Sequence, residues 1–287
     1  MQFSVVLVFL ALVLAGCDEH GDESSRARIS SDDPPAADAA IPRDAAALAT
    51  RLTGTQRALD SAVDEWRSAG NPSSGPPPRD VTLYALDQQR VHLLLADHPR
   101  LAKRVLARLP GRVAAHASAT VRAHRELAPL ATPQPRRAWK TGPPEPAGVL
   151  LEHYQQAQRR FGVGWPVLAA VNLVETAFGR MRSVSTAGAQ GPMQFIPSTW
   201  AAYGLGGDIR DPRDAILGAA NYLHANGAPR NYRRALYHYN PSSHYVDAVL
   251  SYADRIRGDR RNYFAYYAWQ VFVRTPNGVR RITGPGR

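Results

Sequence analysis

Residues Val174 to Trp200 read VETAFGRMRSVSTAGAQGPMQFIPSTW and set a single carboxylate beside an apolar helix face. The helix is predicted to begin at Trp165-Pro166, because proline suits a first turn, and its apolar stripe includes Val171 and Phe178. Glu175 lies four residues after Val171 and three before Phe178, so it borders that stripe. Burial there would raise the pKa of the Glu175 carboxyl, as in enzymes that keep a general acid protonated. From periodicity alone, an acid that points to solvent from the helix edge is the simpler interpretation.

Three motifs occur in a fixed order around this helix. They are VETAFG, then S-x-x-G-A-x-G-P-M-Q-F-x-P-S-T-W, then ALYHYN. Each is weak alone, but the ordered set, over about Val149 to Arg257, resembles the lysozyme-like domain of lytic murein transglycosylases. The resemblance implies a mainly α fold, with a lysozyme-like helical catalytic domain preceded by a helical N-terminal region.

The resemblance also assigns roles to residues. Glu175 occupies the position of the catalytic acid and base, and Ser185 lies near that glutamate in the family. Ser185 and the remaining matched positions are implied to bind substrate, and those positions are Gly191, Met193, Gln194, Tyr239 and Asn240.

The chemistry of these side chains is compatible with the roles. A methionine suits an apolar sugar face, and the amide of Gln194 can donate to and accept from an N-acetyl group. Gly191 permits a close backbone approach, and the Tyr239 hydroxyl could orient Glu175 through a hydrogen bond. Each residue has a plainer interpretation: Met193 as core filler, Gly191 as a turn residue, and Tyr239 with Asn240 as a helix end.

A second catalytic acid is missing nearby. Most glycosidases use two carboxylates, yet none lies between residues 176 and 207. Asp208 comes next, and Asp211 and Asp214 have the pattern of a helix N-terminus. The resemblance implies that the sugar supplies the nucleophile: the muramoyl C6 hydroxyl closes onto C1 and leaves a 1,6-anhydro end, with no metal or cofactor.

Metal ligands are not indicated either. His238 and His244 stand alone, without the spacing of a metal site.

The N-terminus indicates export. Residues Phe3 to Gly16 form a short apolar segment that ends in Leu-Ala-Gly before Cys17, the only cysteine. This pattern resembles a bacterial lipobox, which implies a signal peptide over residues 1–16 and a lipid on the thiol of Cys17. The alternative is a secretory signal with an incidental cysteine. Export places the protein in the cell envelope, anchored on the outside of the cytoplasmic membrane or in the outer membrane.

The net charge of +11, with a pI near 10.2, implies an acidic partner. Because export removes nucleic acid from consideration, the expected partners are peptidoglycan glycan strands, the membrane that holds the anchor, and other cell-wall enzymes.

The rest of the chain divides at proline-rich segments. We expect a flexible tether over residues 17–47, a helical accessory region over 48–130, a linker over 131–148, and the catalytic domain over 149–287. The accessory region should hold a helix over 48–68 and helical periodicity over 81–130. Its Arg and His residues are expected on the polar faces, either as ordinary solvated side chains or, less simply, as a platform that touches an anionic polymer. Further helices are predicted from Asp211 to Gly227 and over 245–257, followed by a small hairpin near the end.

Two other functions remain open from the sequence. A hydrolytic muramidase could use the same fold and pass the intermediate to water. A non-catalytic wall-binding scaffold lipoprotein could retain the groove, although an intact Glu175 and Gln194 favour an enzyme.

Overall fold

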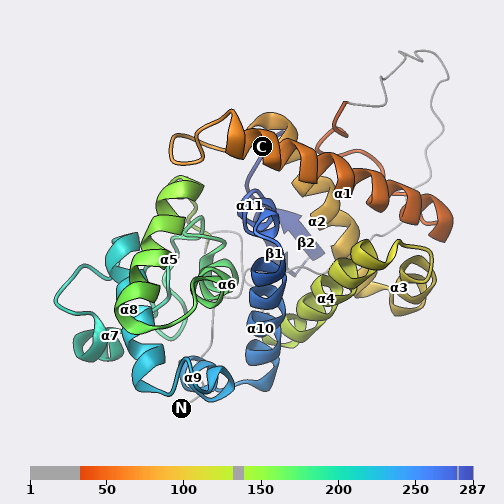
Figure 1. Ribbon diagram of the computed structural model, residues 1–287. Helices are drawn as coiled ribbons and strands as arrows, with labels where there is room; N and C mark the ends of the chain where they lie inside the picture. The colour runs from red at the N-terminus through yellow and green to blue at the C-terminus, as the bar shows by residue number, and fades with distance from the viewer. Residues whose placement is uncertain (1–32, 132–138, 277, 287) are drawn as a thin grey trace.

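The computed structural model describes residues 33–131, 139–276 and 278–286, and helices dominate these residues (Figure 1). The elements are α1 (Ala45–Ser68), α2 (Arg79–Asp97), α3 (Pro99–Leu106), α4 (Gly111–Leu127), the 3-10 helix η1 (Ala128–Leu130), α5 (Ala147–Phe161), α6 (Trp165–Thr176), α7 (Pro197–Tyr203), α8 (Pro212–Ala225), α9 (Tyr232–Tyr239), α10 (Ser243–Gly258), α11 (Arg261–Tyr267), β1 (Phe272–Thr275) and β2 (Gly278–Arg281). The prediction of a mainly α fold with a small C-terminal hairpin is confirmed.

Helix α10 occupies the middle of the molecule. It packs against α4 on one side and against α6 on the other, and its ends meet α9 and α11. Figure 1 shows α1 to α4 on one side of α10 and α5 to α9 on the other. Ser242 caps its N-terminus by accepting a hydrogen bond from the Tyr245 backbone, and Tyr245, Val249 and Tyr252 are buried. The helix therefore joins the two halves of the chain.

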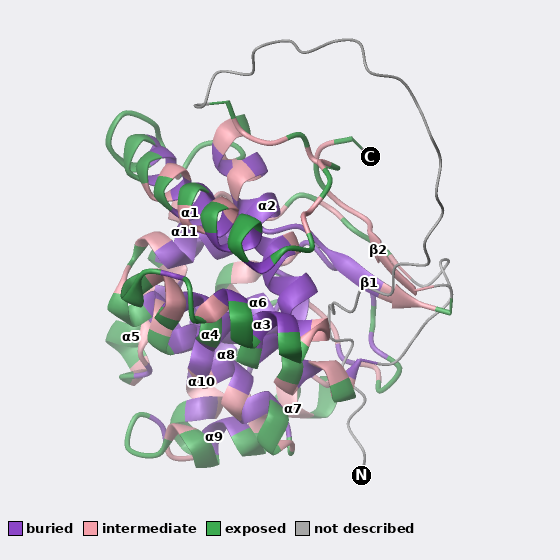
Figure 2. Cartoon of the chain, turned by 90° about the vertical axis from the view of Figure 1, so that its right-hand side faces the viewer, coloured by how far each residue is buried: buried purple, intermediate pink, exposed green. Residues whose placement is uncertain are grey.

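One hydrophobic core extends through both halves. It combines Leu59, Leu86 and Leu127 of the predicted accessory region with Leu168 and Val249 of the predicted catalytic domain. Figure 2 shows the same pattern, with buried segments in the centre and exposed ones on the outside. The division into two domains stays a proposal, because the two regions share this core.

Part of the predicted linker is attached to the catalytic half. Thr141 pairs with Met181 in an isolated antiparallel bridge. The Arg182 backbone N–H donates to the Lys140 carbonyl at 2.8 Å, and the Gly142 N–H donates to the Arg180 carbonyl at 3.0 Å. These residues therefore behave as an edge of the domain, while residues 132–138 lie outside the described part of the chain.

The described end of the predicted tether also contacts the helices. The Arg51 guanidinium donates to the Ala40 carbonyl at 2.6 Å, and that of Arg90 donates to the Ala39 carbonyl at 2.8 Å. Asp44 accepts from two backbone N–H groups at 2.9 Å, so α1 begins at Ala45, before the predicted start at residue 48. Within the predicted tether, Ala39, Ala40 and Asp44 therefore form hydrogen bonds with residues of α1 and α2.

The predicted signal peptide, residues 1–16, and the lipidated Cys17 lie outside the described residues. Over the residues that the structure describes, no helix has both the length and the apolar character that a membrane crossing needs.

Local signals in the catalytic half are confirmed with small shifts. Pro166 lies in the first turn of α6, and Asp211 caps α8 by accepting a hydrogen bond from the Asp214 N–H at 3.0 Å. Helix α8 ends at Ala225, just before Gly227 with φ of 115°. In the hairpin, β1 and β2 are antiparallel, with Val273 opposite Arg280.

The expectation that histidines lie on solvated faces of the accessory region is wrong for His92, His116 and His124, which are buried. Two of the rings stack on aromatic side chains near the C-terminus: His124 on Trp269, just after α11, and His116 on Tyr266 of α11. The sequence pattern did not reveal this, because the partners are more than a hundred residues away.

Candidate active site

Glu175 is buried at the C-terminal end of α6, with 3% of its surface exposed. Every residue of α6 from Pro166 to Thr176 is buried, as expected for a helix that is apolar on all sides and lies in the core. Burial raises the pKa of the Glu175 carboxyl to about 8, and a hydrogen bond from Tyr245 opposes part of this effect. The carboxyl therefore holds a proton at neutral pH. The interpretation of Glu175 as a solvent-facing acid is excluded.

Tyr245, and not Tyr239, contacts the Glu175 carboxyl. The Tyr245 hydroxyl donates to Glu175 Oε1 at 2.7 Å. The Tyr239 hydroxyl donates instead to the Met193 carbonyl at 2.6 Å. The two tyrosine rings are nearly parallel, with centroids 6.5 Å apart. The hydrogen bond to Glu175 that was expected of Tyr239 is therefore donated by the neighbouring Tyr245.

A cleft opens beside Glu175. Its lining comes from the end of α6, the loop between α6 and α7, and helices α7, α8 and α9, and Glu175 is the only acid among the lining residues that the structure describes. Its free volume is about 70 Å³. The residues of the loop that line it are Ser185, Ala187, Ala189, Gln194, Phe195 and Ile196.

The loop that carries Ser185 is held by its own hydrogen bonds. The Ser185 hydroxyl accepts from the Ala187 N–H at 3.2 Å and from the Ala189 N–H at 2.9 Å. Gln190 and Phe195 exchange backbone hydrogen bonds of 2.8 and 2.9 Å, which close a tight turn between them. Ser185 thus lies in the cleft near Glu175 and also shapes the loop.

Gln194 lies at the cleft in a left-handed backbone conformation, with φ of 51°. Its side-chain N–H donates to the Gly191 carbonyl at 3.1 Å. Its Oε1 is buried and accepts no hydrogen bond from the described residues. An unpaired amide oxygen at a cleft is an acceptor available to a ligand.

Three residues that the resemblance assigns to substrate binding are not among the residues that line the cleft. The Met193 side chain is fully buried in the core, and its expected contact with a sugar face stays a prediction. Gly191 has φ of 74°, and a Cβ there would lie 1.8 Å from the Ile209 carbonyl oxygen, so its close approach is to the protein backbone. Asn240 is buried at the end of α9 and does not line the cleft.

Four cleft-facing or carboxyl-facing residues escaped the sequence reasoning: Thr199, Tyr222, His238 and Tyr245. Thr199 lies within the recognised segment, and His238 lies within the ALYHYN motif. Tyr222 and Tyr245 lie on separate helices, and no spacing in the sequence connects them with Glu175.

The next acids after Glu175 in the sequence serve a turn and a helix end. Asp208 accepts from the Arg210 N–H at 2.8 Å, Asp211 caps α8, and Asp214 accepts from the Asp208 N–H at 3.0 Å. None of them lines the cleft. Within residues 33–131, 139–276 and 278–286, no cluster of three or more His, Cys, Asp or Glu could hold a metal ion.

Comparison with known proteins agrees with the site geometry. Residues 152–258, which contain the whole cleft and Tyr245, match the family described as Transglycosylase SLT domain. The membrane-bound lytic murein transglycosylase F of Thiobacillus denitrificans (strain ATCC 25259 / T1) is 36% identical over 74 residues, 26% of this chain. The match spans only 15% of that relative's length, and no solved structure matches the chain significantly. Residues 152–258 of the chain therefore match a transglycosylase SLT domain, and the lytic murein transglycosylase that it resembles supports the same assignment.

Proposed function

We propose that the protein is a peptidoglycan lytic transglycosylase that cleaves the β-1,4 bond between N-acetylmuramic acid and N-acetylglucosamine without water. The observation that carries the proposal is a single buried carboxyl, Glu175, with a pKa raised to about 8, at a cleft whose described lining holds no second acid.

The chemistry needs one group that is first an acid and then a base. Protonated Glu175 gives its proton to the glycosidic oxygen, and the bond from that oxygen to C1 of the muramoyl unit breaks. The resulting Glu175 carboxylate then takes the proton of the muramoyl C6 hydroxyl, whose oxygen bonds to C1. Glu175 ends as it began, protonated, and the product carries a 1,6-anhydro ring.

Tyr245 assists this cycle through its hydrogen bond to Oε1. The bond fixes the direction of the carboxyl and stabilises the charged state that forms between the two proton transfers. Without such a donor, the buried carboxylate formed after the first step would be less stable.

The cleft offers polar groups for the sugar substituents. The unpaired Oε1 of Gln194 can accept from an N-acetyl N–H, while Ser185 and Tyr239 add hydroxyl groups beside it. Gly191 and Met193 shape the turn that presents Gln194, and Asn240 ends α9 next to Tyr239. These are the roles we propose for the residues that the family resemblance assigns to substrate binding.

The decisive experiment is product analysis of purified peptidoglycan digested with the full chain. Wild type should give 1,6-anhydromuropeptides and incorporate no heavy oxygen from labelled water. Glu175→Gln keeps the shape of the side chain but removes the transferable proton, so activity should fall by a factor of about 10² to 10⁴ or more. Asp208→Asn, which changes an acid outside the cleft, serves as the matched control and should remain active.

Two outcomes would contradict this assignment. Labelled reducing ends would identify a hydrolytic muramidase. An active Glu175→Gln variant would exclude Glu175 as the acid and base.

We further propose that Cys17 carries a lipid that anchors the protein at the cell envelope, where it remodels the wall. The support is the Leu-Ala-Gly-Cys sequence after an apolar segment. Cys17→Ser should leave the membrane fraction, and mass spectrometry of the mature N-terminus should show a lipidated Cys17 in the wild type. A variant that stays in the membrane fraction would contradict the anchor.

A further inference from the structure

A second and larger cavity lies away from the Glu175 cleft. It has a volume of about 720 Å³ and lies between α1, the start of α4, and the junction of α10 with α11. Its lining includes Arg255 near the C-terminal end of α10, whereas Tyr245 of the catalytic site lies near the N-terminal end. Ten residues of helix separate the two, about 15 Å along the axis. The described linings of the two cavities share no residue.

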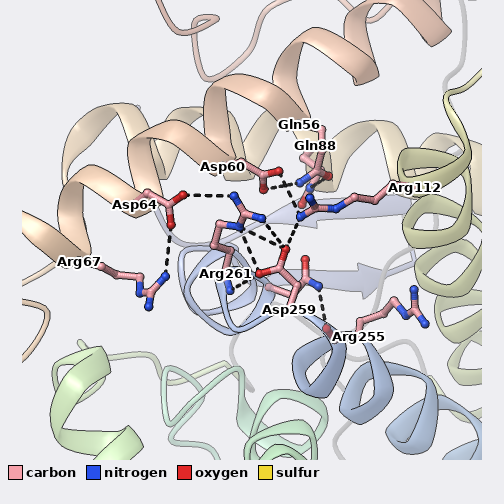
Figure 3. A network of polar contacts seen from close by, with 10 residues as sticks. Gln56, Asp60, Asp64, Arg67, Gln88, Arg112, Arg255, Asp259 and Arg261 are labelled. Carbon is pink, nitrogen blue, oxygen red and sulfur yellow. Dashed lines mark hydrogen bonds and ion pairs between the residues drawn. The ribbon is translucent and has the colours of Figure 1, made fainter.

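The carboxylates of this cavity are already neutralised by the protein. Asp259 pairs with Arg261 at 3.0 Å and also with Arg112, and Asp64 pairs with Arg261 at 3.1 Å. Asp60 accepts a 2.9 Å hydrogen bond from Gln56. Figure 3 shows this network, with Asp60 and Asp64 on α1 facing Arg261 and Arg112 reaching in from α4.

The network also sets the charges of its members. Burial acts to raise the pKa of Asp259, but the hydrogen bonds and charge of Arg261 outweigh it and lower that pKa. Asp259 is therefore firmly ionised. Because these aspartates are paired with protein side chains, they offer little negative charge to a cationic ligand.

Two other guanidinium groups of the lining have no such partner. Arg57 and Arg255 form no ion pair with any described residue, and the Arg255 Nε is buried without a hydrogen bond. In Figure 3 the Arg255 guanidinium stands outside the dashed network. Four arginines and three aspartates line the cavity, so the charge left over is positive.

His116 adds a buried polar group to the same wall. Its ring is 6% exposed, and its Nε2 has no partner among the described residues. Burial lowers the pKa of His116 to about 4, and the charges of Arg255 and Arg112 act in the same direction. The charge of Asp259 acts in the opposite direction but does not outweigh them, so the ring is neutral at pH 7.

A purely structural role would account for only part of this arrangement. Arg112 and Arg261 tie α1, α4 and α11 together, which a latch between the halves of the chain requires. Arg57 and Arg255 would weaken such a latch, because their positive charges repel Arg112 and Arg261 and they form no ion pair with a described residue in return. Their presence beside an unpaired buried imidazole is explained by a negatively charged ligand.

We propose that this cavity binds a small ligand with oxyanion groups, either carboxylate or phosphate, held by Arg57 and Arg255 beside His116. A guanidinium binds either group through two parallel hydrogen bonds. The volume is in the range of small-molecule sites. The proposal does not depend on the reaction at Glu175.

The test is calorimetric titration of the full chain with inorganic phosphate and, separately, with citrate as a carboxylate probe. At least one should bind saturably at one site per chain, and the stronger one identifies the preferred oxyanion. Arg255→Gln should weaken that binding at least about tenfold, the effect of losing one charge-assisted hydrogen bond. Arg230→Gln is the matched control, because Arg230 is exposed and lies outside this cavity, and it should leave the affinity within about twofold.

A second variant distinguishes a loss of binding from a loss of folding. Arg57 is exposed on α1, so Arg57→Gln should weaken binding while the melting temperature of the free protein stays unchanged. Glu175→Gln should bind the probe as the wild type does, which separates this site from the cleft. The proposal is overturned if neither probe binds saturably, or if Arg230→Gln weakens binding as much as Arg255→Gln and Arg57→Gln do.

Discussion

The hydroxyl of Tyr245, in the first turn of α10, donates a 2.7 Å hydrogen bond to Oε1 of Glu175, in the last turn of α6. Two opposing effects act on the pKa of the Glu175 carboxyl. Burial raises the pKa of the Glu175 carboxyl, and the hydrogen bond lowers it by stabilising the carboxylate. Because burial is the larger effect, the pKa is about 8. The acid is protonated at neutral pH, yet close enough to neutrality to serve as a base in the next step.

Tyr245→Phe should move the alkaline limb of the pH–rate profile upward. Wild-type kcat/KM should fall as pH rises through about 8, since the protonated acid is needed first. Removing the hydroxyl removes the effect that lowers the pKa, so the limb should shift upward by about 1–2 units. The maximal rate should also fall, because the carboxylate formed in the reaction loses its donor.

Tyr239→Phe is the matched control for that experiment. It removes a hydroxyl from the neighbouring ring, but one that donates to the Met193 carbonyl and not to Glu175. It should change the rate or KM through the loop while the alkaline limb stays near that of the wild type. Equal shifts in both variants would contradict a specific role for Tyr245.

The parts of the fold that local chemistry controls could be predicted from the sequence. Pro166 in the first turn of α6 and Asp211 as the cap of α8 act on their own neighbours, so their effects can be read from adjacent residues. Asp44 carried the same kind of signal, and recognising it as a cap would have placed the start of α1 correctly.

Contacts between distant segments could not be predicted in this way. Tyr239 and Tyr245 are both tyrosines near the third motif, and only the tertiary packing decides which ring reaches Glu175. Met193 was assigned to the sugar because its backbone belongs to the groove segment, but its side chain turns into the core. The order of motifs gives the location of a site, while the direction of each side chain depends on the packing.

Glu175→Gln should make the protein more stable at high pH. The pKa of Glu175 is raised in the folded state, so its contribution to stability is fully present below the ordinary value of 4.5 and is lost as pH rises to about 8. The glutamine side chain of the variant does not ionise, so the variant does not lose this stability at high pH. Urea unfolding at pH 9 should show a gain of a few kcal/mol for the variant, since one pKa unit corresponds to about 1.4 kcal/mol.

At pH 5 the difference between Glu175→Gln and the wild type should be small, because the acid is protonated in the folded state. Glu152→Gln is the control: Glu152 is exposed on α5, so the variant removes no buried charge. If the stability difference between Glu175→Gln and the wild type were no larger at pH 9 than at pH 5, the buried, proton-holding carboxyl would be contradicted.

Acid should destabilise the protein through its buried histidines. Burial lowers the pKa of His116 to about 4 and that of His124 to about 3, and it lowers the pKa of His92 well below 6.5. The unfolded chain therefore binds protons that the folded chain excludes, and stability falls as pH drops below 6.5. The loss from His116 alone should approach roughly 3 kcal/mol at pH 4.

His92→Leu should reduce this acid sensitivity. Neither ring nitrogen of His92 has a hydrogen-bond partner among the described residues, so the substitution removes a protonation site and no recorded bond. The unfolding free energy of the variant should fall less between pH 7 and pH 4.5 than that of the wild type. His224→Leu, at an exposed position on α8, should follow the wild type. Equal acid sensitivity in all three proteins would exclude His92 as a source of it.

Gly191→Ala should disable the cleft, whereas Gly188→Ala in the same loop should be tolerated. Both glycines have positive φ, 74° and 82°, so a side chain at either position strains the backbone by about 1–2 kcal/mol. Only at Gly191 does a Cβ collide with the protein, 1.8 Å from the Ile209 carbonyl oxygen, while Gly188 faces open space.

The Gly191 carbonyl also accepts the side-chain N–H of Gln194, so moving it displaces that amide from the cleft. Activity of Gly191→Ala should therefore fall at least about tenfold below that of Gly188→Ala, which corresponds to about 1.4 kcal/mol in the barrier. Its melting temperature should also be the lower of the two. Equal activity and stability in the two variants would show that contact with Ile209 does not hold the turn in place.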